Sequence, residues 1–363
     1  GATTGQGSIK SLKVSNTFIP PVGTTDERPS APKPGAFYYN KDFKTIEFWD
    51  GNFWRQVDNK VSSGRMVFAG GYDTNPHGAA TKTQIDYFNL STGGNAIKFG
   101  DMTTAVTNTN GTGNSIRGLI CNGYADGDII QYITIASEGN TIDFGNRTID
   151  TYGGQAVASD TRAVFVAGSG NNAIDYVEIM TTGNATDFGD CGSGSDYRGH
   201  SQSPTRGVIY AGGYNGTYGS AISTFLISSK GNSYPWGDAA SGNHKYVTGQ
   251  SNSVRGIYSM GTGHPTSNGV NDRQTEAFEL ASYGLGVDFG ELMYRNGRTS
   301  AAASQTRVVF AGGQNTQPSG WQIATSQAVT IATKGSAEYF GELTVARDQF
   351  AGLSDCHGGL GGF

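Results

Sequence analysis

The chain has 363 residues, of which 56 are glycine, and only 15% of its residues carry a formal charge. This composition argues against a helical bundle, because glycine weakens helix interiors while the strand-favouring residues Thr, Tyr, Phe, Val and Ile abound. The 25 basic and 30 acidic side chains give a net charge of −5, which argues against the basic surface that nucleic acids require. We therefore predict an all-β chain with no nucleic-acid partner.

The apolar runs, cysteines and histidines argue against further classes of protein and of site. No run of about 18 apolar residues occurs, and the first ten residues lack the apolar core of a signal peptide, so we expect no membrane insertion. The three cysteines show no CxxC spacing, and the five histidines show no HxH or HExxH spacing. We therefore predict no disulfide framework, no metal site and no cofactor.

Residues 1–60 are expected to form a small N-terminal β module. A stretch rich in turns and proline, residues 18–35, precedes three predicted strands at 36–40, 45–49 and 53–57. Three strands over about 60 residues are marginal on their own, so we expect the module to lean on the rest of the chain or on copies of itself. The second domain is expected to span residues 61–363.

The second domain is dominated by a repeat in which an aromatic residue precedes glycine. The six copies recur at intervals of 44 to 53 residues, and two apolar residues lie eleven and nine positions before each aromatic residue. This spacing places both apolar side chains on one face of a strand. The aromatic residues are Phe99, Phe144, Phe188, Trp236, Phe289 and Phe340.

An arginine marks a second strand in every copy of the repeat. Each arginine precedes a short apolar run, and the sixth residue after it is glycine, as expected for a buried strand that ends in a tight turn. The arginines are Arg65, Arg117, Arg162, Arg206, Arg255 and Arg307. Recurrence in every copy favours a scaffold role, such as pairing with a carboxylate or a backbone carbonyl, over an anion-binding ring.

Each copy therefore holds four strands in about 45 residues, which is typical of a propeller blade. A solenoid of six stacked units would show the same period but would need polar caps at both ends. The first copy starts at Arg65 without a strand before it, whereas the chain ends with an extra strand at 347–354. We predict a six-bladed β-propeller of four-stranded blades, in which this C-terminal strand completes the first blade.

Residues 23–54 resemble a module of tailed-bacteriophage fibre and virion structural proteins. The matching residues are Gly23-Thr24-Thr25, Arg28-Pro29, Pro32, Gly35, Tyr39-Asn40, Glu47, Asp50-Gly51 and Trp54. The segments 205–213 and 142–145 resemble the kelch-like repeats of virion proteins, particularly of phages that infect cyanobacteria. Most copies lack the Tyr and Trp that follow the double glycine in true kelch repeats, so kelch partners are not carried over.

The resemblance implies a virion component, such as part of a tail fibre or another surface appendage. Its partners would be other virion proteins, through the N-terminal module, and a glycan or protein of the host surface. An oligomer is also implied, a trimer if the chain belongs to a fibre. A purely architectural decoration protein and a glycan-active enzyme are the alternatives, although the sequence lacks the repeated Asp boxes of sialidase propellers.

Recognition is expected in the loops that follow the glycine of each buried strand. These loops differ in length from copy to copy, and blade topology places them on one face of a rigid scaffold. Aromatic side chains there could stack on sugar rings. The candidate ligand-binding residues are Tyr72, His77, Tyr214, Tyr218, His264 and Trp321. We expect no catalytic residues.

Overall fold

A computed structural model gives the fold, and it is all-β. It describes residues 15–42, 45–49, 51, 54–57, 64–74, 80–90, 93–121, 123–124, 126–192, 194, 196–210, 212–213, 218–261, 273–315 and 321–359. These residues form no α-helix, and hence no helix able to span a membrane; the 3₁₀ turn η2 (His357–Gly359) is their only helical element. The chain divides into two compact units, Gly1–Val61 and Ser62–Phe363. The expected all-β class is confirmed.

The N-terminal unit contains one sheet with a buried ion pair. Its strands lie in the order β1 (Val22–Gly23), β2 (Phe37–Asn40), β3 (Thr45–Trp49) and β4 (Trp54–Val57), with β1 parallel to β2 and the other pairs antiparallel. Both carboxylate oxygens of buried Glu47 accept hydrogen bonds from Arg28, at 2.8 and 2.6 Å, and Asn40 donates a third at 3.2 Å. Three residues of the phage-like motif thus meet around one buried carboxylate.

In the second unit, the described residues form six antiparallel sheets of four strands, numbered here in chain order. The first sheet is β33 (Ala351–Ser354), β5 (Arg65–Ala69), β8 (Gln84–Asn89) and β9 (Ile97–Asp101); the second is β10 (Asn110–Gly113), β11 (Arg117–Cys121), β12 (Ile129–Thr134) and β13 (Ile142–Asn146); the third is β14 (Gln155–Ala158), β15 (Arg162–Val166), β16 (Ala173–Glu178) and β17 (Thr186–Asp190). The fourth is β18 (Gly199–Gln202), β19 (Arg206–Tyr210), β20 (Ala221–Leu226) and β21 (Tyr234–Asp238); the fifth is β22 (Thr248–Ser251), β23 (Arg255–Ser259), β24 (Gln274–Glu279) and β26 (Val287–Glu291); the sixth is β28 (Ser300–Ala303), β29 (Arg307–Ala311), β31 (Thr325–Thr330) and β32 (Glu338–Glu342).

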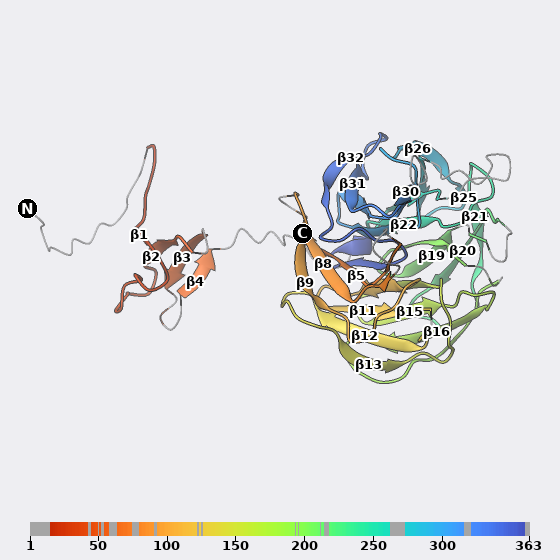
Figure 1. The fold of residues 1–363 in the computed structure, drawn as a ribbon, viewed down its shortest axis with the longest axis horizontal. Helices are drawn as coiled ribbons and strands as arrows, with labels where there is room; N and C mark the ends of the chain where they lie inside the picture. Colours follow the sequence, from red (N-terminus) through yellow and green to blue (C-terminus); the bar gives the residue numbers. More distant parts are fainter. Residues whose placement is uncertain are drawn as a thin grey trace, which may run out of the picture. The chain divides into compact units, whose positions relative to one another are not determined.

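The C-terminal strand completes the first sheet, as predicted. Strand β33 pairs antiparallel with β5, from Ala351 opposite Ala69 to Ser354 opposite Met66. The first strands also contact one another from sheet to sheet: β10 contacts β33 and β14, β18 contacts β14 and β22, and β28 contacts β22 and β33. In Figure 1 the blue strands β31 and β32 accordingly lie beside the orange strands β8 and β9.

The aromatic-Gly motif is the joint between one sheet and the next. The carbonyl of each Phe accepts a hydrogen bond from a glycine N–H in the last turn of the following sheet, for example Gly183 to Phe144 at 2.8 Å and Gly94 to Phe340 at 3.1 Å. A Cβ atom on the motif glycine would lie 1.8–2.5 Å from that turn, in all six copies. Glycine is therefore required because two backbones meet there.

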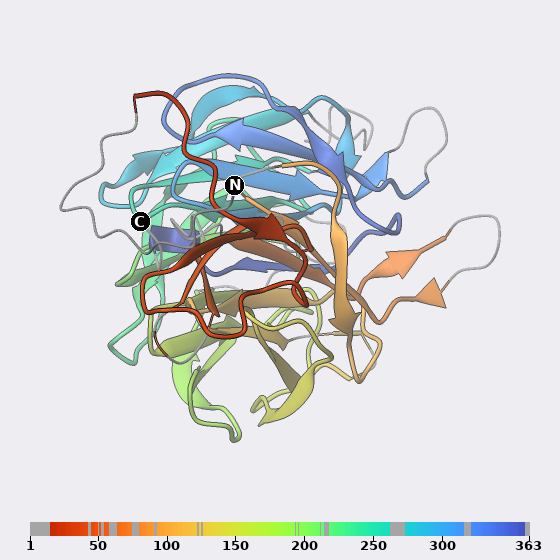
Figure 2. The same cartoon turned by 90° about the vertical axis from the view of Figure 1, so that its left-hand side faces the viewer.

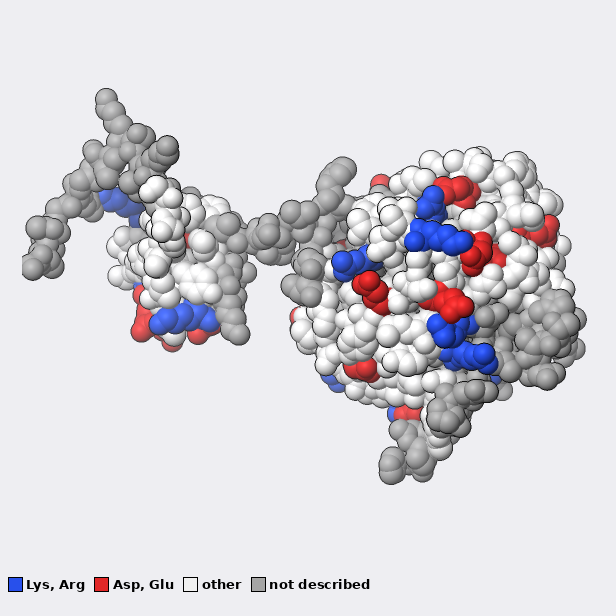
Figure 3. Space-filling view, turned by 90° about the horizontal axis from the view of Figure 1, so that it is seen from above, with Lys and Arg blue, Asp and Glu red and all other residues white. Residues whose placement is uncertain are grey.

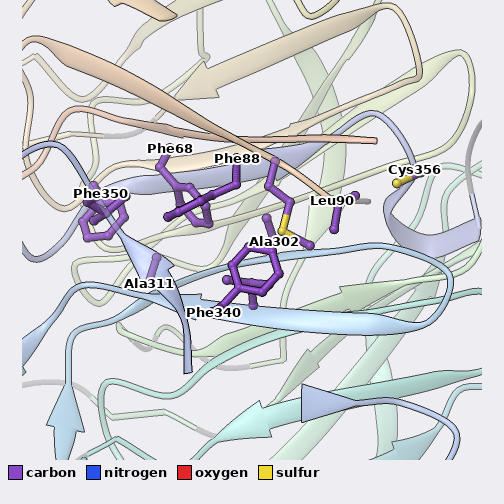
Figure 4. Close-up of a cluster of buried hydrophobic side chains, with 11 residues drawn as sticks. Phe68, Phe88, Leu90, Ala302, Ala311, Phe340, Phe350 and Cys356 are labelled. Atoms are coloured by element: carbon purple, nitrogen blue, oxygen red, sulfur yellow. The ribbon is translucent and has the colours of Figure 1, made fainter. Parts of the chain in front are cut away.

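Each hydrophobic core lies between two consecutive sheets. The cluster of Figure 4 joins the sixth sheet to the first: Phe88 of β8 packs against Phe340 of β32, with ring centroids 5.5 Å apart, and Phe68 of β5 packs against Phe350, with centroids 5.9 Å apart. Five further clusters join the first sheet to the second and so on to the sixth. Each sheet therefore shares a buried hydrophobic core with each of two neighbouring sheets.

Four of the six repeated arginines reach across the same joints. Arg65, Arg117, Arg162 and Arg255 each donate to the backbone carbonyl of an isoleucine in the next sheet, at 2.9–3.2 Å. Arg206 instead lies over the ring of Trp236, 4.2 Å from its centroid, and donates to the Tyr234 hydroxyl. The scaffold role of the arginines stays a prediction, and the four inter-sheet contacts are of the kind it invokes.

Short additional strands decorate the sheets. β25 (Gly284–Leu285) adds to β21 in parallel, β27 (Asn296–Gly297) pairs with β30 (Gln314–Asn315), and β6 (Tyr72–Asp73) pairs with β7 (Ala80–Thr81). The orange pair β6 and β7 projects from the sheets in Figure 2. Part of a loop that the sequence assigned to irregular structure is therefore a hairpin.

Candidate functional site

Six residues, one per sheet, share an unusual backbone conformation. Each lies two positions before the first strand of its sheet and has a φ between +53° and +65°. They are Asn108, Gly153, Tyr197, Tyr246, Arg298 and Gln349, and we call them the rim. The left-handed region suits glycine, yet five of the six positions carry side chains, including two tyrosines.

The rim residues surround one depression in the second unit. All six line it, and it encloses about 530 Å³, including the solvent at its opening. Its walls also contain Asn110, Gln155, Arg198, His200 and Thr248. The lining described by the structure therefore contains amides, hydroxyls, rings, two guanidinium groups and the aliphatic side chains of Val247 and Ala301, with no carboxylate.

The base of the depression is an ordered set of neutral polar groups. His200 is 5% exposed, and Nδ1 lies 2.7 Å from Oε1 of Gln155, while the amide nitrogen of Gln250 lies 2.9 Å from Nε2. Asn110 donates to the same Gln155 oxygen at 2.9 Å. Burial, with a smaller effect of His357, lowers the pKa of His200 to about 3, so this imidazole stays neutral.

Aromatic and cationic groups form one side of the rim. The rings of Tyr197 and Tyr246 lie 4.3 Å apart, and the guanidinium carbon of Arg298 lies 4.7 Å from the centroid of Tyr246. Lys245 lies over both tyrosine rings, at 5.3 and 5.1 Å. A Cβ atom at Gly153 would lie 3.3 Å from the Tyr197 ring, so the one glycine of the rim stands where Tyr197 needs room.

A buried carboxyl group lies behind this side. Nη1 of Arg298 is 3.7 Å from Asp348, which also accepts a hydrogen bond from Gln322 at 3.2 Å. Burial raises the pKa of Asp348 to about 6, and Arg298 and Gln322 partly oppose the shift. Arg298, whose side chain is 31% exposed, lines the depression and also donates to the Tyr246 hydroxyl at 3.2 Å.

The loops that follow the glycines meet the rim from outside. Tyr72 pairs with Asp348, Gly213 with Asp196, and Gly261 with Lys245, each next to or near a rim residue. The loop face that the sequence predicted and the rim therefore lie at the same end of the sheets. Figure 3 shows one face of this unit, on which basic and acidic side chains form small groups within a largely uncharged surface.

The structure describes three of the six predicted ligand-binding residues, and these three lie outside the depression. Tyr72 and Tyr218 are partly buried, and Trp321 is 40% exposed, but none of the three lines it. His77, Tyr214 and His264 lie outside the described residues. The rim itself was missed, although five of its residues stand nine positions before the repeated arginines. The signal available in the sequence was a position at a constant distance before the repeated arginine whose residue type varies among the copies.

Neither a model of a known protein family nor a curated protein matches the chain. Within the described ranges, no group of three or more His, Cys, Asp or Glu side chains is arranged to hold a metal ion. Function must therefore be argued from the rim and its surroundings.

Proposed function

We propose that residues 62–363 form a closed six-bladed β-propeller in which each four-stranded sheet is one blade. Three observations support it: the joint between Phe340 and Gly94, the core between the sixth and first sheets, and the pairing of β33 with β5. Each of them links the end of the repeat to its beginning. A solenoid would leave its terminal units apart.

On this propeller, the rim is a carbohydrate-binding site. The observation that carries this proposal is the set of five side chains kept at left-handed backbone positions. Such positions cost free energy for residues other than glycine, and strain of this kind clusters at ligand sites. Glycine serves at many other left-handed positions of this chain, so retained Tyr, Arg and Gln side chains at the rim point to a use for them.

The chemistry of the rim suits a polar ligand with apolar faces. Amides of Asn110, Gln155 and Gln349 supply paired donors and acceptors, which match the hydroxyl groups of a sugar. Tyr197 and Tyr246 supply ring edges and hydroxyls, and Arg298 supplies a donor. Glycoside hydrolysis requires two carboxyl groups beside the bond, whereas the described lining offers donors and rings, which favours binding over cleavage.

The proposed biological setting is a virion appendage that uses the rim to recognise the host surface. The support is the resemblance of residues 23–54 together with the contacts of Arg28, Asn40 and Glu47, which show that the resembling residues form one structural centre. The N-terminal unit would attach to other virion proteins. A decoration protein without a ligand remains the competing account.

A glycan array probed with the full chain tests the proposal. We expect binding to a subset of glycans, with loss of the signal in Tyr246→Gly, because this change removes the side chain while its backbone conformation suits glycine. Trp321→Ala is the matched loop variant, and we expect it to bind as the parent does. Binding lost only in Trp321→Ala would move the site to the loops, and an array without any bound glycan would favour the decoration protein.

A further inference from the structure

The junctions between consecutive sheets share a polar contact that one junction lacks. At five of the six, a side chain on the third strand of a sheet accepts the backbone N–H that follows the fourth strand of the preceding sheet, at 2.7–3.3 Å. The accepting residues are Asp86, Gln131, Asp175, Glu276 and Gln327. All five side chains are buried.

The exception lies between the third and fourth sheets, where the corresponding residue is Ser223. Its side chain is shorter, and the N–H of Gly192 instead donates to Oγ of Ser233, at 3.1 Å. A cavity of about 870 Å³, part of it open to solvent, occupies this junction and is lined by Cys191, Arg198, Ser223 and Ser233. The missing contact therefore coincides with a space that connects the junction to solvent.

Charge at this junction is arranged differently as well. At two other junctions a fully buried arginine pairs with the accepting carboxylate: Arg147 with Asp175 at 2.7 Å, and Arg347 with Asp86 at 3.1 Å. Here Nη1 of buried Arg198 donates to Sγ of Cys191 at 3.0 Å. The sulfur thus receives a guanidinium contact of the kind that a carboxylate receives elsewhere in the unit.

The three cysteines differ in their surroundings. Burial raises the pKa of the Cys121 thiol to about 12 and raises that of Cys356 as well. Burial would also raise the pKa of Cys191, but Arg198 and the hydroxyls of Ser233 and Ser223, 3.5 and 3.8 Å from the sulfur, together lower it. A thiolate beside a cation is the reactive form of cysteine.

We propose that Cys191 is a modification site that forms mixed disulfides with small disulfide compounds entering through this cavity. Held by Arg198, the sulfur attacks one sulfur of the disulfide R–S–S–R. The S–S bond of the reagent breaks, a bond between Cys191 and S–R forms, and R–S⁻ leaves and takes a proton from water. The reagent is itself the oxidant, so no other partner is needed.

Reaction of the folded full chain with 4,4′-dithiodipyridine tests the proposal, because each thiol that reacts releases one absorbing thiopyridone. We expect one fast equivalent at neutral pH, mapped to Cys191 by peptide mass spectrometry, and slow reaction of Cys121 and Cys356. The fast equivalent should disappear in Cys191→Ser. In Ser223→Asp, a carboxylate would compete for Arg198, so we expect the rate to fall by about tenfold or more, as each unit by which the thiol pKa rises above the pH removes about a factor of ten in thiolate.

Ser223→Ala is the matched control, since it alters the same position without adding a charge, and it should keep the fast equivalent. A melting curve of each variant establishes that the fold is retained. A fast equivalent that maps to Cys121 or Cys356, or a thiol count of zero until the chain is unfolded, would overturn the proposal. Equal rates in Ser223→Asp and Ser223→Ala would overturn the role given to Arg198.

Discussion

Replacing Gly341 by alanine should strain the joint between the sixth sheet and the first. Its Cβ atom would lie 2.0 Å from the carbonyl oxygen of Gly94, a backbone atom that cannot turn away as a side chain can. The φ of Gly341 lies outside the left-handed region, so the expected effect comes from this contact alone. Strand β32, which contains Gly341, and the turn that contains Gly94 must therefore move apart.

The structure sets the size of the effect. Three hydrogen bonds hold the joint: Gly94 to Phe340 at 3.1 Å, Ala96 to Glu342 at 2.8 Å, and the Glu342 N–H to Asn95 at 3.2 Å. Each contributes about 0.5–1.5 kcal/mol, so weakening two or three of them lowers the free energy of unfolding by about 1–4.5 kcal/mol. For a unit of this size the melting temperature should fall by roughly 2–7 °C.

Scanning calorimetry and urea unfolding of the full chain measure this loss, with Gly335→Ala as the control. Gly335 lies in the turn that precedes the strand of Gly341, β32, but no atom lies within 4 Å of its Cβ position. Gly335→Ala should be neutral or stabilise by up to about 1 kcal/mol, because alanine restricts the unfolded chain. Equal stability of the two variants would show that the sixth and first sheets do not meet as described.

Three further predictions concern the same unit. Removing residues 350–363 should abolish cooperative unfolding, measured by circular dichroism, because β5 loses one of its two partner strands and buried Phe350 and Leu353 are lost; native-like melting of the truncated chain would contradict this. Arg162→Ala should lower the free energy of unfolding by about 1–3 kcal/mol, since its guanidinium donates to two backbone carbonyls of the next sheet, and glycan binding should not change. Stability should fall between pH 6.5 and about pH 3, because buried His200 and His357, with pKa values lowered to about 3 and about 4, take up protons only on unfolding. Asp348, whose pKa is raised to about 6, opposes this loss below pH 6, so His200→Gln and His357→Gln should reduce the loss in urea titrations at several pH values, and an unchanged slope would refute the assignment.

The strands of the six sheets could be predicted from the sequence because the residue patterns that indicate them lie within each strand and its turns. Apolar alternation before Phe144 or Phe188 requires one buried face, and β12 and β16 lie where that pattern placed a strand. The phase of the repeats predicts a surplus strand at 347–354, and its second half, Ala351–Ser354, pairs with β5. The reason for the glycine after each aromatic residue was beyond the sequence, because the atom that excludes a side chain belongs to the next sheet.

The site was harder to predict because its signal is conformational. Nothing in the letters of Tyr246 or Arg298 shows a positive φ, and residues of these types rarely adopt one. A prediction based on residue type therefore favours aromatic residues in the long loops, such as Trp321. The missing contact at Ser223 could not be predicted either, because serine is common in strands. It becomes an exception only when the structure shows that the equivalent residue at the five other junctions has a longer side chain that accepts a hydrogen bond.

Repetition would let the rim hold the proposed ligand site. Six equivalent backbone positions border one depression, and five types of residue occupy them. The joints between sheets, in contrast, require the same residue in every copy. A glycine and a facing glycine carbonyl recur there, because two backbones must meet at van der Waals distance. The joints that stabilise the fold therefore lie in what the six units share, and under the proposed function ligand specificity would lie in the residues by which they differ. If a ligand is bound, exchanging side chains among rim positions should change which ligand binds before it changes the melting temperature.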